Sequence, residues 1–253
     1  MPRSGLCSVT FRALSATEVV DAAQEAGLGC LEWGTDVHVP VDALANAARV
    51  GELTRRAGLR ASSLGSYVRA GSGSVEEWRA VVATAQAVGA PRVRIWAGDV
   101  GSDEAGTEGR QAVAHWTHWA AEMAEDAGLT VAFEFHRWTL TDSVESTLRL
   151  LADIDHPAVS TYWQPRVGEP AAAAVDGLER LLPHVSALHV FSWWPQTQRR
   201  PLDTRGDLWS RALALAARGP RRPEALLEFV PDDDPHLLSR EAAALHRLQT
   251  SNL

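Results

Sequence analysis

The sequence contains no lysine, and arginine accounts for all 24 residues counted as lysine plus arginine. Without a lysine amine the chain cannot form the Schiff base that many aldolases and pyridoxal enzymes need. The Gly-x-x-x-x-Gly-Lys phosphate loop is also missing. Two cysteines, Cys7 and Cys30, are too few for a disulfide scaffold, and we expect both to be small core residues. These absences exclude several reaction classes without indicating one.

Long hydrophobic runs are also missing. No stretch reaches the roughly 18 apolar residues of a membrane span, and the opening MPRSGLCSV has no apolar segment of the kind found in signal peptides. We therefore expect a cytoplasmic protein with no membrane partner. The formal net charge is −8. Negative charge repels phosphate backbones, so we expect no nucleic-acid partner.

Short apolar runs alternate with longer amphipathic ones along all 253 residues. Ser15 with Glu18, and Ser74 with Glu77, are capping-box patterns at the starts of two helices. We expect strands at 6–10, 30–33, 60–67, 92–96, 130–135, 158–163, 185–191 and 225–230. We expect helices at 15–26, 41–57, 74–88, 107–127, 142–152, 171–182, 205–217 and 235–248. Eight such units without a linker predict one α/β domain over residues 1–253, a (β/α)8 TIM barrel. An open doubly wound sheet is the alternative, but Gly-x-Gly-x-x-Gly does not follow the first strand.

Ionisable residues interrupt strands that should be apolar on both faces. Glu134, His189 and Glu228 lie near the ends of the fifth, seventh and eighth strands, and Glu32 lies in the second. Taken singly, each has a structural explanation, as a hydrogen-bonded core histidine or the partner of an arginine. Together they indicate a site, because strand ends converge at the C-terminal mouth of a barrel. Such a group needs a cation to offset repulsion and desolvation, and its ligand types suit Mn, Mg, Co or Zn.

The segments GCLEWGTDVHVP, AFEFH, VSTYWQP, LHVFSW and LLEFVPDD, in this order, resemble the xylose isomerase-like barrels. This superfamily holds sugar isomerases, keto-sugar 3-epimerases, inosose-processing enzymes and apurinic endonucleases. Its epimerase-like members hold one divalent metal with Glu, Asp, His and Glu at the ends of strands five to eight. The resemblance implies that the metal ligands here are Glu134, Gln164, His189 and Glu228. Gln164 stands where the family has Asp, and Val167 where it has His, so the ligand set is less negative and should bind metal less tightly.

The resemblance further implies a sugar isomerase or epimerase that acts on a small keto-sugar or polyol-derived substrate through an enediolate. Glu134 and Glu228 would be the catalytic acid and base, and the cation would stabilise the enediolate. The sequence does not assign which glutamate is the acid. Ten tryptophans fit a sugar substrate, because indole faces pack on the C–H faces of sugar rings. Expected substrate contacts at strand ends and in the following loops are Trp33, His38, Tyr67, Trp96, His136, Arg137, Trp163, Trp193 and Arg200, with Asp36 beside them.

Other interpretations stay open. A dehydratase or lyase acting on an inosose-like cyclic polyol would use the same enediolate and lose a β-hydroxyl. Gln164 keeps open a barrel that binds a ligand without catalysis, whereas the negative charge disfavours a DNA-repair endonuclease. The acidic segment PDDDPH after the eighth strand disfavours a phosphorylated substrate, although Arg199 and Arg200 could clamp a phosphate. Relatives often form dimers or tetramers, which leaves homo-oligomer formation open.

Overall fold

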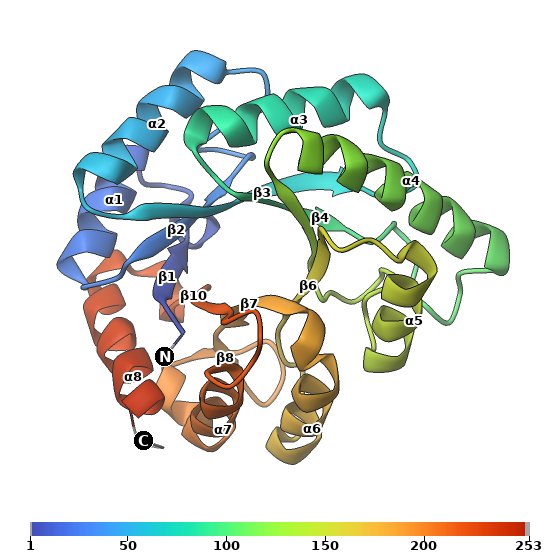
Figure 1. The fold of residues 1–253 in the computed structure, drawn as a ribbon. Coiled ribbons are helices and arrows are strands. Elements are labelled where there is room, and N and C mark those ends of the chain that lie inside the picture. The colour runs from blue at the N-terminus through green and yellow to red at the C-terminus, as the bar shows by residue number, and fades with distance from the viewer. Residues whose placement is uncertain (1, 251–253) are drawn as a thin grey trace.

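A computed structural model describes residues 2–250, and within them eight parallel strands close into a barrel surrounded by helices (Figure 1). The barrel strands are β1 (Ser4–Cys7), β2 (Cys30–Gly34), β3 (Arg60–Arg69), β4 (Arg92–Trp96), β5 (Thr130–Phe133), β6 (Val159–Trp163), β7 (Val185–Val190) and β10 (Glu224–Leu227). The helices between and after them are α1 (Ala16–Glu25), α2 (Leu44–Arg56), α3 (Val75–Val88), α4 (Thr107–Asp126), α5 (Val144–Ile154), α6 (Ala171–Leu181), α7 (Gly206–Ala216) and α8 (Leu238–Thr250). Each barrel strand pairs with the barrel strands that precede and follow it in the chain, and β10 closes the barrel against β1. The predicted (β/α)8 TIM barrel is confirmed.

Four of the eight predicted strands, the first, fifth, seventh and eighth, run too far at their C-terminal ends. β1 stops at Cys7 and passes into a short 3-10 helix, Ser8–Phe11. Glu134 and Glu228 each follow their strand by one residue. Their backbone amides still bond to the neighbouring strand, at 2.9 Å to Ile95 and 3.0 Å to Val190. Both side chains are thus placed by the barrel ladder although the regular strands have ended.

The loop after β7 carries structure that the sequence pattern did not predict. β8 (Ser192–Trp193) and β9 (Arg199–Arg200) form a small antiparallel hairpin beside the barrel mouth. Further 3-10 turns lie at Leu182–His184, Leu202–Arg205, Pro231–Asp233 and Pro235–Leu237. Among residues 2–250, no helix is long and apolar enough to cross a membrane.

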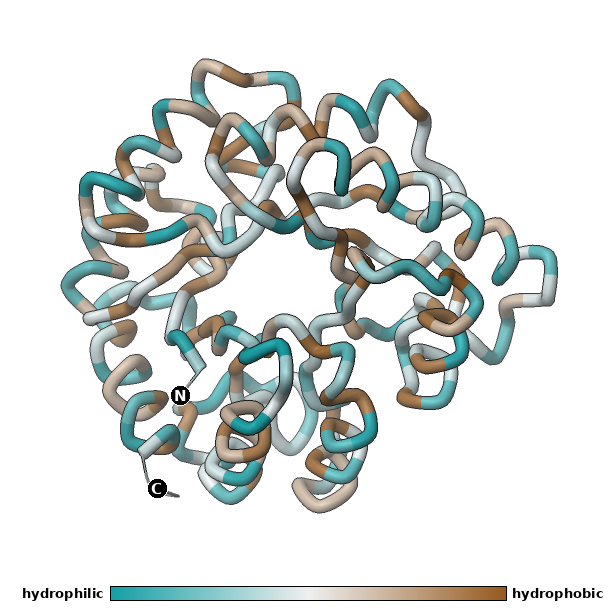
Figure 2. Tube along the Cα trace, in the orientation of Figure 1, coloured by the Kyte–Doolittle hydropathy of each residue, from teal (hydrophilic) through white to brown (hydrophobic). Residues whose placement is uncertain are grey.

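Large apolar side chains fill the layer between strands and helices. Hydrophobic residues, brown in Figure 2, recur along the strands and the helices, with hydrophilic stretches between them. Four tryptophans in this layer are almost fully buried, and three of them donate their indole N–H inside it. The donors are Trp33 to Thr54, Trp78 to Ala120 and Trp209 to Phe191. Satisfied indole groups let tryptophan serve as ordinary core here.

The inside of the barrel, by contrast, carries polar side chains linked by hydrogen bonds. Arg92 donates to the Tyr162 hydroxyl at 3.1 Å, which donates to Ser63 at 2.8 Å. Ser63 in turn donates to Glu32 at 2.7 Å. The predicted core positions of Cys7 and Cys30 are confirmed, since both are buried free thiols. The network leads from the N-terminal end of the barrel to the mouth, where the acidic residues gather.

Candidate active site

A cavity of about 500 Å³ lies at the C-terminal mouth of the barrel. Glu134, Gln164 and Glu228 line it, each following its own strand. Their strands stand in the order β10-β7-β6-β5, so the two glutamates project from strands three places apart around the barrel. Two carboxylates therefore reach a common space from different sides, as acid–base chemistry on one bound molecule requires.

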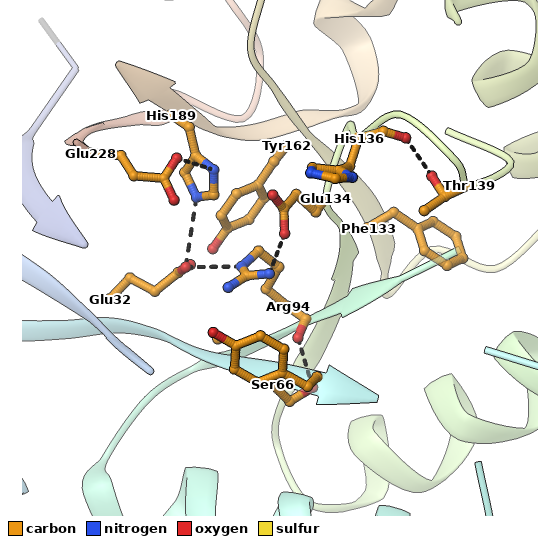
Figure 3. Close-up of polar contacts among 12 residues, drawn as sticks. Glu32, Ser66, Arg94, Phe133, Glu134, His136, Thr139, Tyr162, His189 and Glu228 are labelled. Atoms are coloured by element: carbon orange, nitrogen blue, oxygen red, sulfur yellow. Dashed lines mark hydrogen bonds and ion pairs between the residues drawn. The ribbon is translucent and has the colours of Figure 1, made fainter. Parts of the chain in front are cut away.

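Arg94 on β4 lies between two of the acidic side chains (Figure 3). Its Nε donates to Glu32 at 2.9 Å, and its Nη1 donates to Glu134. Burial opposes the charge on Arg94, but the adjacent glutamates raise its pKa well above the usual value. Burial likewise acts to raise the pKa of Glu32, yet Arg94 and His189 hold it well below its usual value. Gly65 makes room for this group, because a Cβ there would lie 2.6 Å from Arg94 Nη2.

His189 stands on the other side of the same cluster and is fully buried. Its Nδ1 lies 3.0 Å from Gln164 Oε1 and 3.3 Å from a Glu228 oxygen. Its Nε2 lies 3.6 Å from Glu32 and makes no hydrogen bond within the described part of the chain. Burial acts to lower the pKa of His189, but the nearby carboxylates of Glu228 and Glu32 raise it overall. Burial raises the pKa of Glu228 to about 7, with His189 only partly opposing the shift.

The donor atoms here fit a divalent cation. Gln164 Oε1 and the Glu228 oxygen lie 3.0 and 3.3 Å from His189 Nδ1, the spacing of neighbouring ligands around one small ion. Within residues 2–250 no arginine lies within 4.0 Å of Glu228, so a cation would offset a buried charge that arginine does not. Glu134 could add a fourth oxygen, although Arg94 engages one of its two. Carboxylates and an amide oxygen with one imidazole suit a hard or borderline ion.

A tighter group deeper in the barrel does not fit a metal. The ligand atoms of Cys7, Glu32 and His189 all lie within 4.8 Å of one another. Burial raises the pKa of the Cys7 thiol well above its usual value, so the thiol stays protonated. Arg94 already neutralises Glu32. We therefore regard this group as part of the barrel interior.

Aromatic rings form two walls of the cavity. On the side of β4 and β5, Trp96 and His136 stack with ring centroids 4.8 Å apart and planes 23° apart. On the side of β7 and β10, Trp193 lies 5.2 Å from both Phe191 and Phe229. All five rings line the cavity. Polar groups at the floor and aromatic walls suit a small ring that carries hydroxyl groups.

The family model described as "xylose isomerase-like TIM barrel" matches residues 20–166, more than half of the chain. The chain belongs to the xylose isomerase-like TIM barrel family. The family resemblance inferred from the strand-end segments is thus confirmed.

Within the family, similar proteins carry different activities in their names. A 3-dehydroshikimate dehydratase from Bacillus anthracis is 25% identical over 194 residues, which cover 73% of this chain and 69% of the relative. The structure of a probable dehydratase from Bacillus anthracis, AsbF, matches with a TM-score of 0.79 at 21% identity and covers 97% of this chain and 99% of AsbF. An L-ribulose 3-epimerase structure matches with a TM-score of 0.70 at 14% identity and covers 100% and 97%. At these identities the two structures show a shared fold.

Against this family background, part of the predicted site comes together. The predicted residues that line the cavity are Glu134, Gln164, Glu228, Tyr67, Trp96, His136, Arg137 and Trp193. His189 lies directly behind Gln164 and Glu228. These positions are compatible with the predicted roles of these residues as catalytic groups, metal ligands and substrate contacts.

Four predicted substrate contacts need correction, because their side chains lie outside the cavity lining. Trp33 bonds to Thr54 of α2, and Trp163 packs edge-on against a tryptophan of α7. Successive strand residues point to opposite faces, so Glu32 and Gln164 face inward and these two indoles face the helices. His38 is buried, with its Nε2 3.0 Å from a carbonyl oxygen of the β1–α1 loop.

The fourth correction, Arg200, concerns the β8–β9 hairpin. Arg200 is exposed there and donates to the Trp194 carbonyl at 3.5 Å. Asp36, expected beside the substrate, is instead held by Arg12 at 2.5 Å and by Tyr67 at 3.2 Å. Hydrogen bonds inside the protein therefore engage side chains whose positions in the sequence suggested ligand contact.

The sequence interpretation missed several lining residues. Arg94 is the most important, and its signal was present: Arg92 and Arg94 alternate in RVRIW, which places both on the inner face of β4. Arg12, Arg166 and Asp142 also line the cavity from loops. No periodic pattern marks loop residues, so alternation alone could not identify them.

Proposed function

We propose that this chain is a dehydratase that removes water from a small cyclic polyhydroxylated ketone, with Glu134 and Glu228 as its acid–base pair. The observation that carries the proposal is the placement of these two carboxylates in one cavity between aromatic walls. Flat walls favour a substrate ring that becomes planar as a double bond forms. Similarity to a 3-dehydroshikimate dehydratase supports the same reaction class. The sequence favoured an epimerase and kept the dehydratase as the alternative, and these observations reverse that order.

The two glutamates have unlike surroundings, which lets them take different roles. Glu134 accepts the Arg94 hydrogen bond as a carboxylate, and we assign it removal of the proton next to the substrate carbonyl. Glu228 reaches the same cavity from the other side with no arginine beside it in the described chain, and we assign it delivery of a proton to the departing hydroxyl through the oxygen that does not face the cation. The C–H and C–O bonds break, a carbon–carbon double bond forms and the hydroxyl leaves as water. No oxidant or reductant is needed.

A divalent cation, Mn, Mg, Co or Zn, would be held by Gln164, His189 and Glu228, with Glu134 as a fourth ligand. When bound, it would stabilise negative charge on the carbonyl oxygen. The chain's own contribution is positional. Arg94 orients Glu134, and the aromatic walls limit water and hold the ring.

The test is an assay of the purified protein, supplied with Mn²⁺, on 3-dehydroshikimate and on a panel of inososes and ketoses. We expect a carboxylated aromatic product lighter than 3-dehydroshikimate by one water, detected by ultraviolet absorbance and mass spectrometry. EDTA should lower the rate, and added Mn²⁺ should restore it. Water loss from none of the cyclic ketones would overturn the proposal.

A ketose 3-epimerase is the second candidate, because both glutamates reach the same cavity and could exchange a proton across one carbon. A shared fold with an L-ribulose 3-epimerase is consistent with it. The same panel separates the two reactions. Epimer formation in deuterated water, with deuterium at the exchanged carbon and no loss of water, would favour the epimerase.

A further inference from the structure

Arginine side chains surround the mouth of the cavity, and their charges are not equally compensated. In the described chain, the arginines that line it are Arg12, Arg94, Arg137 and Arg166. Arg12 pairs with Asp36 at 2.5 Å, and Arg166 pairs with Glu169 at 2.9 Å. Arg94 is shared by two glutamates, as described above. Arg137 differs, because no carboxylate among residues 2–250 lies within 4.0 Å of its guanidinium.

The loop that carries Arg137 is firmly held. The Arg137 guanidinium lies 4.0 Å from the ring centroid of Trp138, whose side chain is 62% exposed. Trp138 has a φ of 62°, a left-handed conformation that is costly for a large side chain. Two buried threonines offset this cost: Thr141 donates to the Glu134 carbonyl at 2.6 Å, and Thr139 donates to a carbonyl of the same loop at 2.7 Å. The loop thus presents an oriented cation three residues after Glu134, in the lining of the same cavity.

We propose that Arg137 is the anchor for a carboxylate group on the substrate. The inference rests on the proposed function and narrows its substrate class to cyclic polyhydroxylated ketones that carry a carboxylate. Stacking on Trp138 limits the motion of the guanidinium, which lowers the entropy lost when it binds a planar anion. A carboxylate matches the paired N–H donors of arginine.

Nearby groups favour one carboxylate over a phosphate. Asp142 also lines the cavity, but one of its oxygens accepts the Ser102 amide at 2.8 Å, and neither lies within 4.0 Å of Arg137. The loop after β10 adds negative charge, because among the described residues Arg199 pairs with only one of its three aspartates, Asp233. A phosphate dianion would need more than one uncompensated cation. Among the described residues that line the cavity, only Arg137 is a cation without a carboxylate partner. The charge balance therefore fits a monoanion.

The experiment compares two inert ligands that differ in one charge: shikimate, a cyclic polyol carboxylate without the ketone, and its neutral methyl ester. Binding to the full-length protein is measured by calorimetry, or by quenching of tryptophan fluorescence, under one Mn²⁺ concentration. We expect the wild type to prefer shikimate about tenfold, the size of one charge-assisted contact. Arg137→Gln should reduce this preference to within about twofold without changing affinity for the ester, and Arg137→Lys should retain part of it.

Arg166→Gln is the matched control, because it removes a cavity arginine whose charge Glu169 already compensates. It should keep the preference for shikimate. Both side chains are exposed, so both variants should give wild-type circular dichroism spectra. A wild type without preference, or an Arg137→Gln variant that keeps it, would overturn the anchor. These ligands do not react, so a protein that prefers shikimate yet dehydrates nothing would refute the proposed function alone.

Discussion

At the N-terminal end of the barrel interior each charged side chain has a partner of opposite charge, whereas at the mouth the acidic side chains are only partly compensated. At the N-terminal end, Arg92 donates to Glu224 at 2.6 Å, and Arg60 approaches the other oxygen of this carboxylate at 3.0 Å. Arg92 also donates to the Tyr162 hydroxyl at 3.1 Å. Burial opposes the charge on Arg92, but Tyr162 and Glu224 raise its pKa well above the usual value. Each polar group has a partner, as expected for a part of the barrel that serves stability.

At the mouth, acids outnumber the cation. Arg94 is shared by Glu32 and Glu134, and Glu228 depends on His189. The His189 Nε2 makes no hydrogen bond to any described residue. A buried group left short of partners costs stability unless a ligand supplies them. The contrast teaches that incomplete charge compensation, more than the presence of charge, marks the end of the barrel where we propose that chemistry takes place.

The sharpest test of this contrast replaces one glutamate with glutamine at each end of the barrel. Glu228→Gln should lower dehydratase kcat about a thousandfold, because an amide cannot deliver the proton. The matched control, Glu224→Gln, lies at the opposite end of the barrel, outside the cavity lining, and should leave kcat within about threefold. Wild-type circular dichroism in both variants would show that the fold persists. Normal turnover by Glu228→Gln would remove this residue from the mechanism.

Removing the arginine at each end tests the same contrast through stability. Arg94→Met should lower the free energy of unfolding by about 3–5 kcal/mol, because it leaves two buried carboxylates uncompensated. Arg92→Met should cost less, about 2 kcal/mol, since Glu224 keeps Arg60 and remains partly accessible to solvent. Urea unfolding curves at neutral pH measure both values. Equal losses of unfolding free energy would mean that charge compensation by arginine contributes equally to stability at the two ends of the barrel.

The raised pKa of Glu228 gives a prediction for metal-free protein. In the folded state its pKa is about 7, compared with an ordinary value of 4.5. The unfolded chain therefore releases this proton first as pH rises, and stability falls between about pH 4.5 and pH 7. The loss should approach about 3 kcal/mol at pH 8 and should be missing from Glu228→Gln. Unfolding in EDTA at about pH 5 and pH 8 checks this, and a parallel pH response in both proteins would contradict it.

Regular patterns in the sequence predicted the barrel because they reflect local physics. The capping box of Ser15 and Glu18 is present at the start of α1, and Ser74 accepts the Glu77 amide at the start of α3. The 3.6-residue and two-residue periodicities separate helices from strands. The β8–β9 hairpin was missed because its strands are only two residues long. A strand of that length has no detectable period.

The site could be predicted in part, for a similar reason. Family resemblance indicated Glu134 and Glu228, and both line the cavity. Trp33 and Trp163 were assigned to the mouth although strict alternation from Glu32 and Gln164 places them on the helix side. The positions of loop residues that were missed, such as Arg12, Asp142 and Arg166, depend on how loops fold back over the mouth. Their mutual distances arise from tertiary structure, which no local pattern encodes.

The smallest expected effect concerns the cation at the mouth. Gln164→Asp adds a negative charge beside His189 and Glu228, so Mn²⁺ should bind about tenfold more tightly. In EDTA the same variant should be less stable than wild type, because the added acid has no counter-charge. Gln164→Ala is the control and should weaken Mn²⁺ binding, since it removes a ligand oxygen. Calorimetric titration with Mn²⁺ checks both variants. If neither changes the affinity, Gln164 is not a ligand, and its contact with His189 would serve to orient the imidazole.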